Sequence, residues 1–264
     1  MVPSSVIAGQ SVSLAIALFT PLAIFLLWRR RTTMLARNAA VGAAVFVLFA
    51  LVLEPVLHVF LLKANPASAA FFRVHHLAFA VYGSLAAGLF EETGRYLGLR
   101  YAVRPAGNPG TALAYGIGHG GAESIIIGGL AIAQGIAFAL LLNAGKLDST
   151  LSALHLPSAT ATRLREGLLN LTPGLSLVAG FERLIALTAQ IGLSFLVWNA
   201  VETKRTWLVG VAILLHMFTD FGAALLQAGL LKSVALAEGW AFLGLAVIVA
   251  VARQLDKPKQ QGTA

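Results

Sequence analysis

The sequence predicts an all-α protein, a polytopic membrane helix bundle of about seven transmembrane helices. Of its 264 residues, 58% are hydrophobic and only 11% are charged, and the mean hydropathy is +0.82. That is more apolar surface than one soluble core can bury. Apolar windows of about 20 residues, each long enough to cross roughly 30 Å of hydrocarbon, recur along the whole chain.

The first half of the chain contains four predicted spans. Span one, 5–28, has no Lys or Arg before it and WRRR after it, the reverse of the charge order of a cleavable signal peptide, so we expect a permanent helix. Spans two and three, 39–62 and 74–97, flank a short connection with basic residues. Span four, 111–142, is too long for one straight crossing, and it must tilt, break or continue into the polar stretch that follows. Its predicted bend is the pair Gly128-Gly129.

The second half contains the other three spans, 175–200, 207–229 and 234–252. The polar stretch 144–173 before them is partly amphipathic, and it either lies along the outer surface or is an ordinary connector. No internal repeat is visible. We therefore expect one membrane-embedded domain over 1–252 and a polar cytoplasmic tail over 253–264.

Basic residues set the predicted orientation, because Lys and Arg in short loops are retained on the cytoplasmic side. With the N-terminus outside, the outer side collects six of them, Lys63, Arg73, Lys146, Arg163, Arg165 and Lys232. The cytoplasmic side collects eleven, Arg29, Arg30, Arg31, Arg37, Arg100, Arg104, Lys204, Arg205, Arg253, Lys257 and Lys259. The prediction is N-out and C-in. This pattern explains the net charge of +8 without a nucleic-acid partner, and zero cysteines exclude disulfides and thiolate metal sites.

The informative charged residues are those inside the apolar spans, because a charged group in hydrocarbon is costly and usually has a function. They form three sets at helical spacing on spans three, four and six: Glu91, Glu92 and Arg95; His119 and Glu123; His216 and Asp220. Residues three or four apart share a helix face, so pairs can form within each set. Counted at about 1.5 Å per residue from the cytoplasmic ends, all three sets lie roughly 12–14 Å inside. We expect them to converge on one hydrated cavity.

Two kinds of chemistry fit such a cluster. Imidazole and carboxylate groups are zinc ligands at about 2.0–2.2 Å, and a His-x-x-x-acid spacing places both on one side of the ion. Alternatively, a buried carboxylate can act as general base toward water, with a histidine as its partner or as donor to a developing oxyanion. The residue types alone leave both open.

Structural roles compete with these functional ones. Any one of the polar pairs can simply hydrogen-bond a neighbouring helix, and the glycines 116, 118, 120 and 121 are more typical of helix packing than of a substrate groove. Gln190 and Ser194 on span five lie near the inner depth, and we interpret them as helix-packing hydrogen bonds.

A second polar set lies in the predicted outer half of the spans. Glu54 and His58 are four residues apart there, and the same half contains His75, His76, Glu182 and Arg183. We interpret this outer set as interhelical ion pairs, and we expect Glu54 and His58 to lie away from the inner cluster.

Over nearly its whole length, the chain resembles the YhfC-type family of intramembrane metalloproteases. That family is itself similar to CAAX prenyl proteases and bacteriocin-processing enzymes, to PrsW-type site-1 proteases and to the APH subunit of gamma-secretase. The motifs that carry the resemblance are Glu91-Glu92-x-x-Arg95, His119-Gly-Gly-x-Glu123, Glu182-Arg183 with Ala186, and His216-x-x-x-Asp220. The spacing of the first motif and the Asp that ends the last one are more like the YhfC and PrsW branches than the CAAX form.

The resemblance implies an intramembrane peptidase that hydrolyses a peptide bond of a membrane-associated protein or peptide near the cytoplasmic leaflet. Its implied catalytic residues are Glu91 as general base, His119 to orient water or hold a metal, and His216 to complete the metal site or stabilise the oxyanion. The implied supporting residues are Glu92, Arg95, Glu123 and Asp220. A Zn²⁺ ion would be held by His119, His216, Asp220 and Glu123, and a metal-free glutamate mechanism is the alternative.

Two other function classes stay open from the sequence. One is a non-catalytic membrane scaffold or chaperone of the APH type, in which the polar cluster only binds helices together. The other is an ion-coupled transporter, which the lack of a visible inverted repeat disfavours. The expected setting is the cytoplasmic membrane, with a multi-pass chain whose partners are membrane lipid and a membrane-associated substrate.

Overall fold

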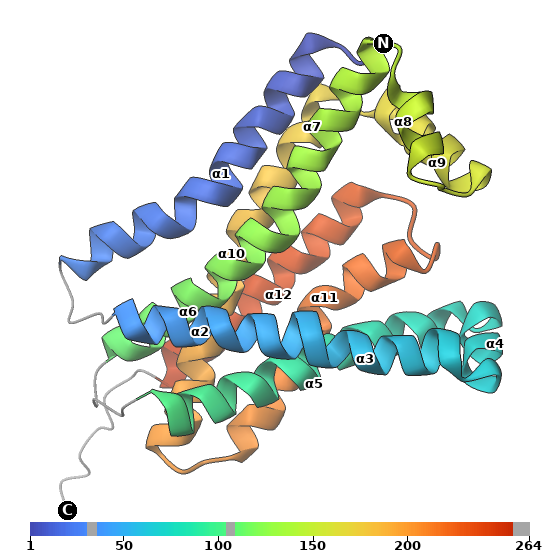
Figure 1. Cartoon of the computed structure of the whole chain (residues 1–264). Helices are drawn as coiled ribbons and strands as arrows, with labels where there is room; N and C mark the ends of the chain where they lie inside the picture. The colour runs from blue at the N-terminus through green and yellow to red at the C-terminus, as the bar shows by residue number, and fades with distance from the viewer. Residues whose placement is uncertain (31–35, 104–108, 256–264) are drawn as a thin grey trace, which may run out of the picture. The chain divides into compact units, whose positions relative to one another are not determined.

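The computed structural model describes residues 1–30, 36–103 and 109–255, and all regular structure in these residues is helical. Figure 1 shows the chain as a set of long helices. Their bounds are α1 (Ser4–Arg29), α2 (Ala36–Leu48), α3 (Glu54–Val59), α4 (Pro66–Val74), α5 (His76–Leu97), α6 (Pro109–Glu123), α7 (Leu130–Asn143), α8 (Leu147–Ala153), α9 (Ser158–Asn170), α10 (Pro173–Glu202), α11 (Trp207–Gln227) and α12 (Val234–Leu255). Four π-helical segments continue these helices: η1 (Phe49–Leu53), η2 (Phe60–Ala64), η3 (Gly98–Ala102) and η4 (Ser124–Gly129).

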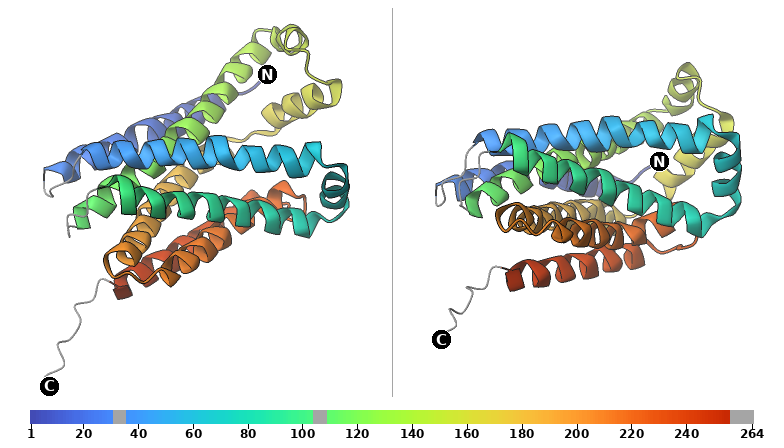
Figure 2. Two further views of the ribbon diagram at one scale, coloured as in Figure 1. Left: turned by 60° about the horizontal axis from the view of Figure 1, so that its bottom comes forward. Right: turned by 90° about the horizontal axis from the view of Figure 1, so that it is seen from below.

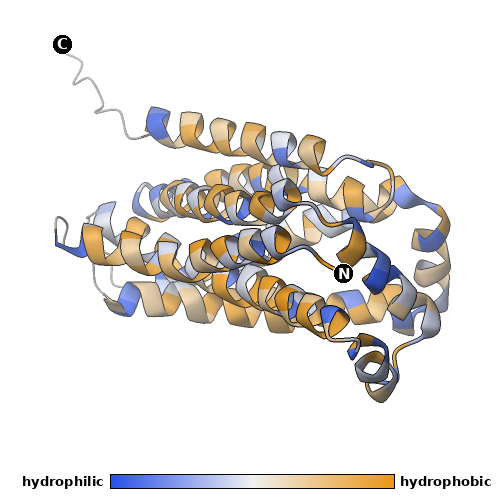
Figure 3. Ribbon diagram, turned by 90° about the horizontal axis from the view of Figure 1, so that it is seen from above, coloured by the Kyte–Doolittle hydropathy of each residue, from blue (hydrophilic) through white to orange (hydrophobic). Residues whose placement is uncertain are grey.

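The predicted all-α membrane fold is confirmed. Six of the described helical runs are long and apolar enough to cross a membrane: Ser4–Arg29, Ala36–Ala64, Pro109–Asn143, Pro173–Glu202, Trp207–Gln227 and Val234–Leu255. The remaining predicted span corresponds to α5, which carries two glutamates and an arginine, so a bundle of about seven is consistent with the structure. Most of the residues along the long helices are apolar (Figure 3), as expected for helices that cross a bilayer.

The chain divides into two compact units, and each is described by itself. Unit 1 consists of Met1–Ala23 and Glu123–Leu184, and unit 2 consists of Ile24–Ala122 and Ile185–Ala264. The expectation of a single membrane-embedded domain stays a prediction. Of the predicted cytoplasmic tail and basic residues, 256–264, Arg31 and Arg104 lie outside the described residues.

In unit 1, the polar stretch 144–173 is folded rather than extended. It forms the short helices α8 and α9, whose apolar residues Leu147, Leu151 and Leu168 are buried against the start of α1. The Asn143 side chain holds the same end of α1, because its amide accepts from the Val2 N–H at 2.7 Å and donates to the Val2 carbonyl at 2.8 Å.

In unit 2, glycines let α2 and α6 cross with their backbones in contact. A β-carbon at Gly42 would overlap the backbone of Tyr115, and one at Gly118 would overlap the Ala39 carbonyl. Gly116 and Gly120 face α10 in the same way, against Ser194 and Gln190. The glycines around His119 are therefore packing residues, as the structural interpretation predicts.

Also in unit 2, α11 packs between α5 and α12. A β-carbon at Gly88 of α5 would lie 2.7 Å from the Ile213 carbonyl of α11, so these two helices also approach closely. The α2–η1–α3 run lies alongside α5, and α4 joins their far ends, as both Figure 1 and Figure 2 show. This arrangement places α3, α5, α6, α10 and α11 around one set of polar side chains.

Candidate functional site

The predicted polar residues of α5 and α11 and His119 of α6 come together in unit 2, where Glu91 pairs with His119. Glu91 Oε2 lies 2.9 Å from His119 Nε2, joining α5 to α6. The Gln190 amide of α10 donates to the same oxygen at 3.1 Å. Glu91 is 7% exposed and His119 is fully buried. In the described part of the chain, the other Glu91 oxygen makes no hydrogen bond within the protein.

Glu92 is the centre of a second group of polar contacts, and its side chain is fully buried. Its two carboxylate oxygens accept from Arg95 Nε at 2.9 Å and Nη2 at 3.1 Å, a bidentate pair within α5. His216 of α11 places Nδ1 2.8 Å from Glu92 Oε1, while its Nε2 lies 3.3 Å from Asp220 Oδ2. Of the pairs that helical spacing allows, Arg95–Glu92, rather than Arg95–Glu91, and His216–Asp220 are present.

Arg95 links this network to α10, and its side chain is fully buried. Besides Glu92, its guanidinium donates to the Gln190 carbonyl at 3.1 Å, to the Gln190 side-chain oxygen and to the Ser194 hydroxyl. Gln190 and Ser194 were expected to serve helix packing only. Gln190 also donates to Glu91, so it connects the Glu91–His119 pair to the Glu92–Arg95 pair. In the sequence, only the depth of Gln190 in span five indicated such a role.

Aromatic rings enclose His119. The Phe46 ring meets it edge-on with centroids 5.3 Å apart, and the Tyr115 ring stacks on it at 6.1 Å. Among the described residues, His119 Nδ1 and the Tyr115 hydroxyl have no hydrogen-bond partner. An imidazole bonded only through Nε2 is consistent with the tautomer that carries its proton on Nε2 and donates to Glu91.

Glu123 does not pair with His119, although the two residues are four apart. It belongs to unit 1, where its carboxylate lies 3.5 Å from Arg183 Nη1. Glu123 is the last residue of α6, and the π-helical segment η4 follows it directly. That segment contains Gly128-Gly129, where a bend was predicted. His119 and Glu123 share α6, and they do not pair because His119 faces Glu91 while Glu123 faces Arg183.

The expectation that Glu54 lies away from the cluster is wrong. Glu54 of α3 is buried, and its carboxylate interacts electrostatically with Glu91, His216 and Asp220. His58 does pair with Glu54, at 3.1 Å, as the spacing predicts. A count of Cα positions placed Glu54 too far out, because its side chain leans toward the N-terminus of its own helix and so toward the level of Glu91.

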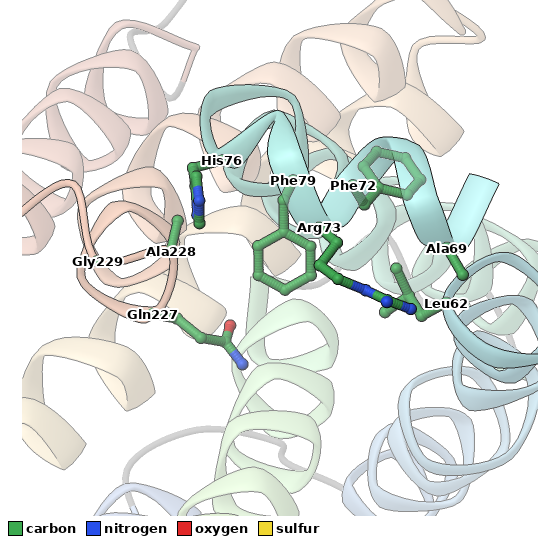
Figure 4. A pocket seen from close by; sticks show the side chains of 9 residues that line it. All are labelled: Leu62, Ala69, Phe72, Arg73, His76, Phe79, Gln227, Ala228 and Gly229. Carbon is green, nitrogen blue, oxygen red and sulfur yellow. The ribbon is translucent and has the colours of Figure 1, made fainter. Parts of the chain in front are cut away.

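A pocket of about 450 Å³ lies elsewhere in unit 2, among the ends of η2, α4, α5 and α11. Figure 4 shows the Phe79 ring at its centre, with Arg73, His76 and Gln227 around it. The cluster residues are not among those that line it. His76 of the predicted outer set is therefore a pocket residue, while Glu182 and Arg183 pair with each other in unit 1.

With this geometry in view, the comparisons with known proteins identify the family. A family model described as the YhfC intramembrane metalloprotease matches residues 14–241. The chain belongs to the YhfC family. The membrane protein YhfC of Bacillus subtilis (strain 168) is 34% identical over 239 residues, which cover 90% of this chain and 92% of that protein. No solved structure matches the chain.

The description of the YhfC family implies a metal. Across the described residues, no group of three or more His, Cys, Asp or Glu side chains is arranged to hold one ion. His119 and His216 each face a different glutamate, and Glu123 pairs with Arg183 instead of joining them. The residues expected as zinc ligands therefore do not fit a metal in this arrangement, and no chemical step below is assigned to one.

Proposed function

We propose that this multi-pass YhfC-family protein is an intramembrane peptidase of the cytoplasmic membrane. It would hydrolyse a peptide bond of a membrane-associated protein or peptide near the cytoplasmic leaflet. The observation that supports this best is the buried Glu91–His119 pair, in which one carboxylate oxygen is held and the other is left for water.

Glu91 has the environment that a general base needs. His119 and Gln190 both hold Oε2, which fixes the plane of the carboxylate and directs Oε1 away from them. A water bound to Oε1 would lose a proton to it while its oxygen forms a bond to the carbonyl carbon of the substrate. The proton then passes from Glu91 to the leaving amine as the C–N bond breaks, which yields a carboxylic acid and an amine and restores Glu91.

His216 is suited to stabilise the developing oxyanion. Both of its ring nitrogens face carboxylate oxygens, so a proton on each nitrogen satisfies both contacts. The Nδ1 contact is to buried Glu92 and is the shorter one. The Nε2 contact at 3.3 Å is to Asp220, whose side chain is 43% exposed, so a substrate oxygen can replace Asp220 as the acceptor.

Glu92 and Arg95 support these groups. Their bidentate pair neutralises two buried charges and fixes His216 through Glu92 and Glu91 through Gln190. Because each member is bonded on several sides, the network can hold the reacting groups in place without solvent.

The decisive experiment uses cells that produce either the unchanged protein or the Glu91→Gln variant. Membrane proteins that accumulate uncut only with Glu91→Gln are the substrates, and cleavage is then measured with purified protein. We expect a loss of about 100- to 10,000-fold with the fold intact, because Gln keeps the size of Glu but cannot take a proton from water. The matched control is Glu202→Gln, an exposed carboxylate of unit 2 that should change nothing. Full activity of Glu91→Gln would eliminate the peptidase and favour the scaffold.

A further inference from the structure

We propose that Glu54 is a positioning residue of this site, held by His58 and Tyr82 so that its carboxylate acts on Glu91 and His216 from α3. The inference rests on the proposed peptidase function. It adds a fifth helix to a site that the sequence motifs confine to α5, α6 and α11, with α10 supporting them.

Glu54 is held by a chain of side-chain hydrogen bonds. The Tyr82 hydroxyl of α5 lies 2.5 Å from His58 Nδ1, and His58 Nε2 lies 3.1 Å from Glu54 Oε1. The His58 and Tyr82 rings also meet edge-on, with centroids 5.4 Å apart. The two contacts fix the orientation of the imidazole, which in turn fixes one oxygen of Glu54.

The helix geometry directs Glu54 toward Glu91. The α2–η1–α3 run and helix α5 are antiparallel neighbours (Figure 2). The His58–Tyr82 contact therefore sets the register between them. From that contact, Glu54 is four residues and Glu91 nine residues toward the same end, which separates their Cα levels by only about 7–8 Å at 1.5 Å per residue. Side chains lean toward the N-terminus of their own helix, and in antiparallel helices these directions are opposite. The two carboxylates therefore lean toward each other.

Burial strengthens the electrostatic interaction between the Glu54 and Glu91 carboxylates. The Glu54 side chain is only 11% exposed and that of Glu91 only 9%, so little water screens them from each other. Glu91, His216 and Asp220 are the charged groups of the site that interact electrostatically with Glu54.

The expected role follows from the signs of these charges. When it is ionised, the Glu54 carboxylate repels that of Glu91, which favours the Glu91 orientation bonded to His119 and Gln190. The same carboxylate attracts a protonated His216. Glu54 does not contact the peptide bond. It acts by keeping Glu91, the base, and His216, the oxyanion donor, in their productive orientations.

A double-mutant cycle tests the placement of Glu54 without a substrate. Thermal unfolding is measured for the full chain in detergent, with Glu54→Gln, Glu91→Gln and both together. Because either change removes the same repulsion, we expect the Tm shifts to depart from additivity by about 2–4 °C. The control cycle pairs Glu91→Gln with Glu202→Gln and should be additive. Additive shifts in the Glu54 cycle would overturn the inference.

A kinetic test on the substrate found with Glu91→Gln addresses the role. We expect Glu54→Gln to lower kcat roughly tenfold with KM unchanged, a loss of about 1.4 kcal/mol in the transition state. Glu54→Asp, which keeps the charge, should recover most of kcat, and Tyr82→Phe should lose less than Glu54→Gln. If Glu91→Gln abolishes cleavage while Glu54→Gln keeps full kcat, only the Glu54 inference fails. If Glu91→Gln keeps full activity, the proposed function fails and the role of Glu54 in it fails too.

Discussion

Replacing Arg95 by Met would remove five hydrogen bonds from the centre of unit 2 in one step. Two of them go to Glu92, whose side chain is fully buried and would remain as a carboxylate without its cation. Breaking a buried ion pair from one side costs about 3–5 kcal/mol, because an uncompensated charge is left behind. For a chain of this size, that corresponds to a fall in Tm of roughly 6–20 °C at about 2–4 °C per kcal/mol.

The partner variant makes this prediction specific. Arg95→Met combined with Glu92→Gln removes both charges, so we expect it to be more stable than Arg95→Met alone, even though it carries an additional substitution. The assay is thermal unfolding of the purified protein in one detergent, followed by circular dichroism. An Arg95→Met Tm within about 2 °C of the unchanged protein, or a double variant less stable than the single one, would refute the claim that this pair is a buried ion pair.

Three further predictions concern packing, metal and topology. Gly118→Ala should destabilise the protein by about 1–3 kcal/mol, because a β-carbon there overlaps the Ala39 carbonyl, and Gly83→Ala, which meets nothing, is its control in unfolding experiments. A chelator should leave cleavage of the identified substrate unchanged, and about one metal per chain together with loss of activity would contradict the metal-free mechanism. Reporter fusions should place residue 34 and the C-terminus in the cytoplasm and residue 150 outside, and an external C-terminus would contradict the charge argument.

Local sequence rules predicted much of the site because helix periodicity and burial act over a few residues. The pairs Arg95–Glu92 and His216–Asp220 lie within single helices, and both formed as their spacing predicts. The convergence of Glu91 and His119 also followed, since α5 ends and α6 begins at the same predicted membrane surface, and both residues lie at a similar depth from it.

What the sequence did not predict depends on contacts between helices. His119 had two possible acidic partners, and the crossing of α5 and α6 selected Glu91 over Glu123. Gln190 belongs to none of the sequence motifs. Its role arises because α10 packs beside both Arg95 and Glu91, so that its side chain bonds to both. Glu54 was placed in the outer half because a count of Cα positions ignores the direction in which side chains lean.

The bidentate Glu92–Arg95 pair also has a consequence for how the chain enters the bilayer. α5 carries three charged residues within five positions, and a lone Arg near the middle of an inserting helix costs about 2.5–3.5 kcal/mol on translocon scales. Because Glu92 and Arg95 are three residues apart, they can neutralise each other as soon as α5 becomes helical. Gln190, Ser194 and His216 are synthesised later and join afterwards. The nascent helix therefore brings its own counter-charge to the insertion machinery and does not have to wait for the second half of the protein.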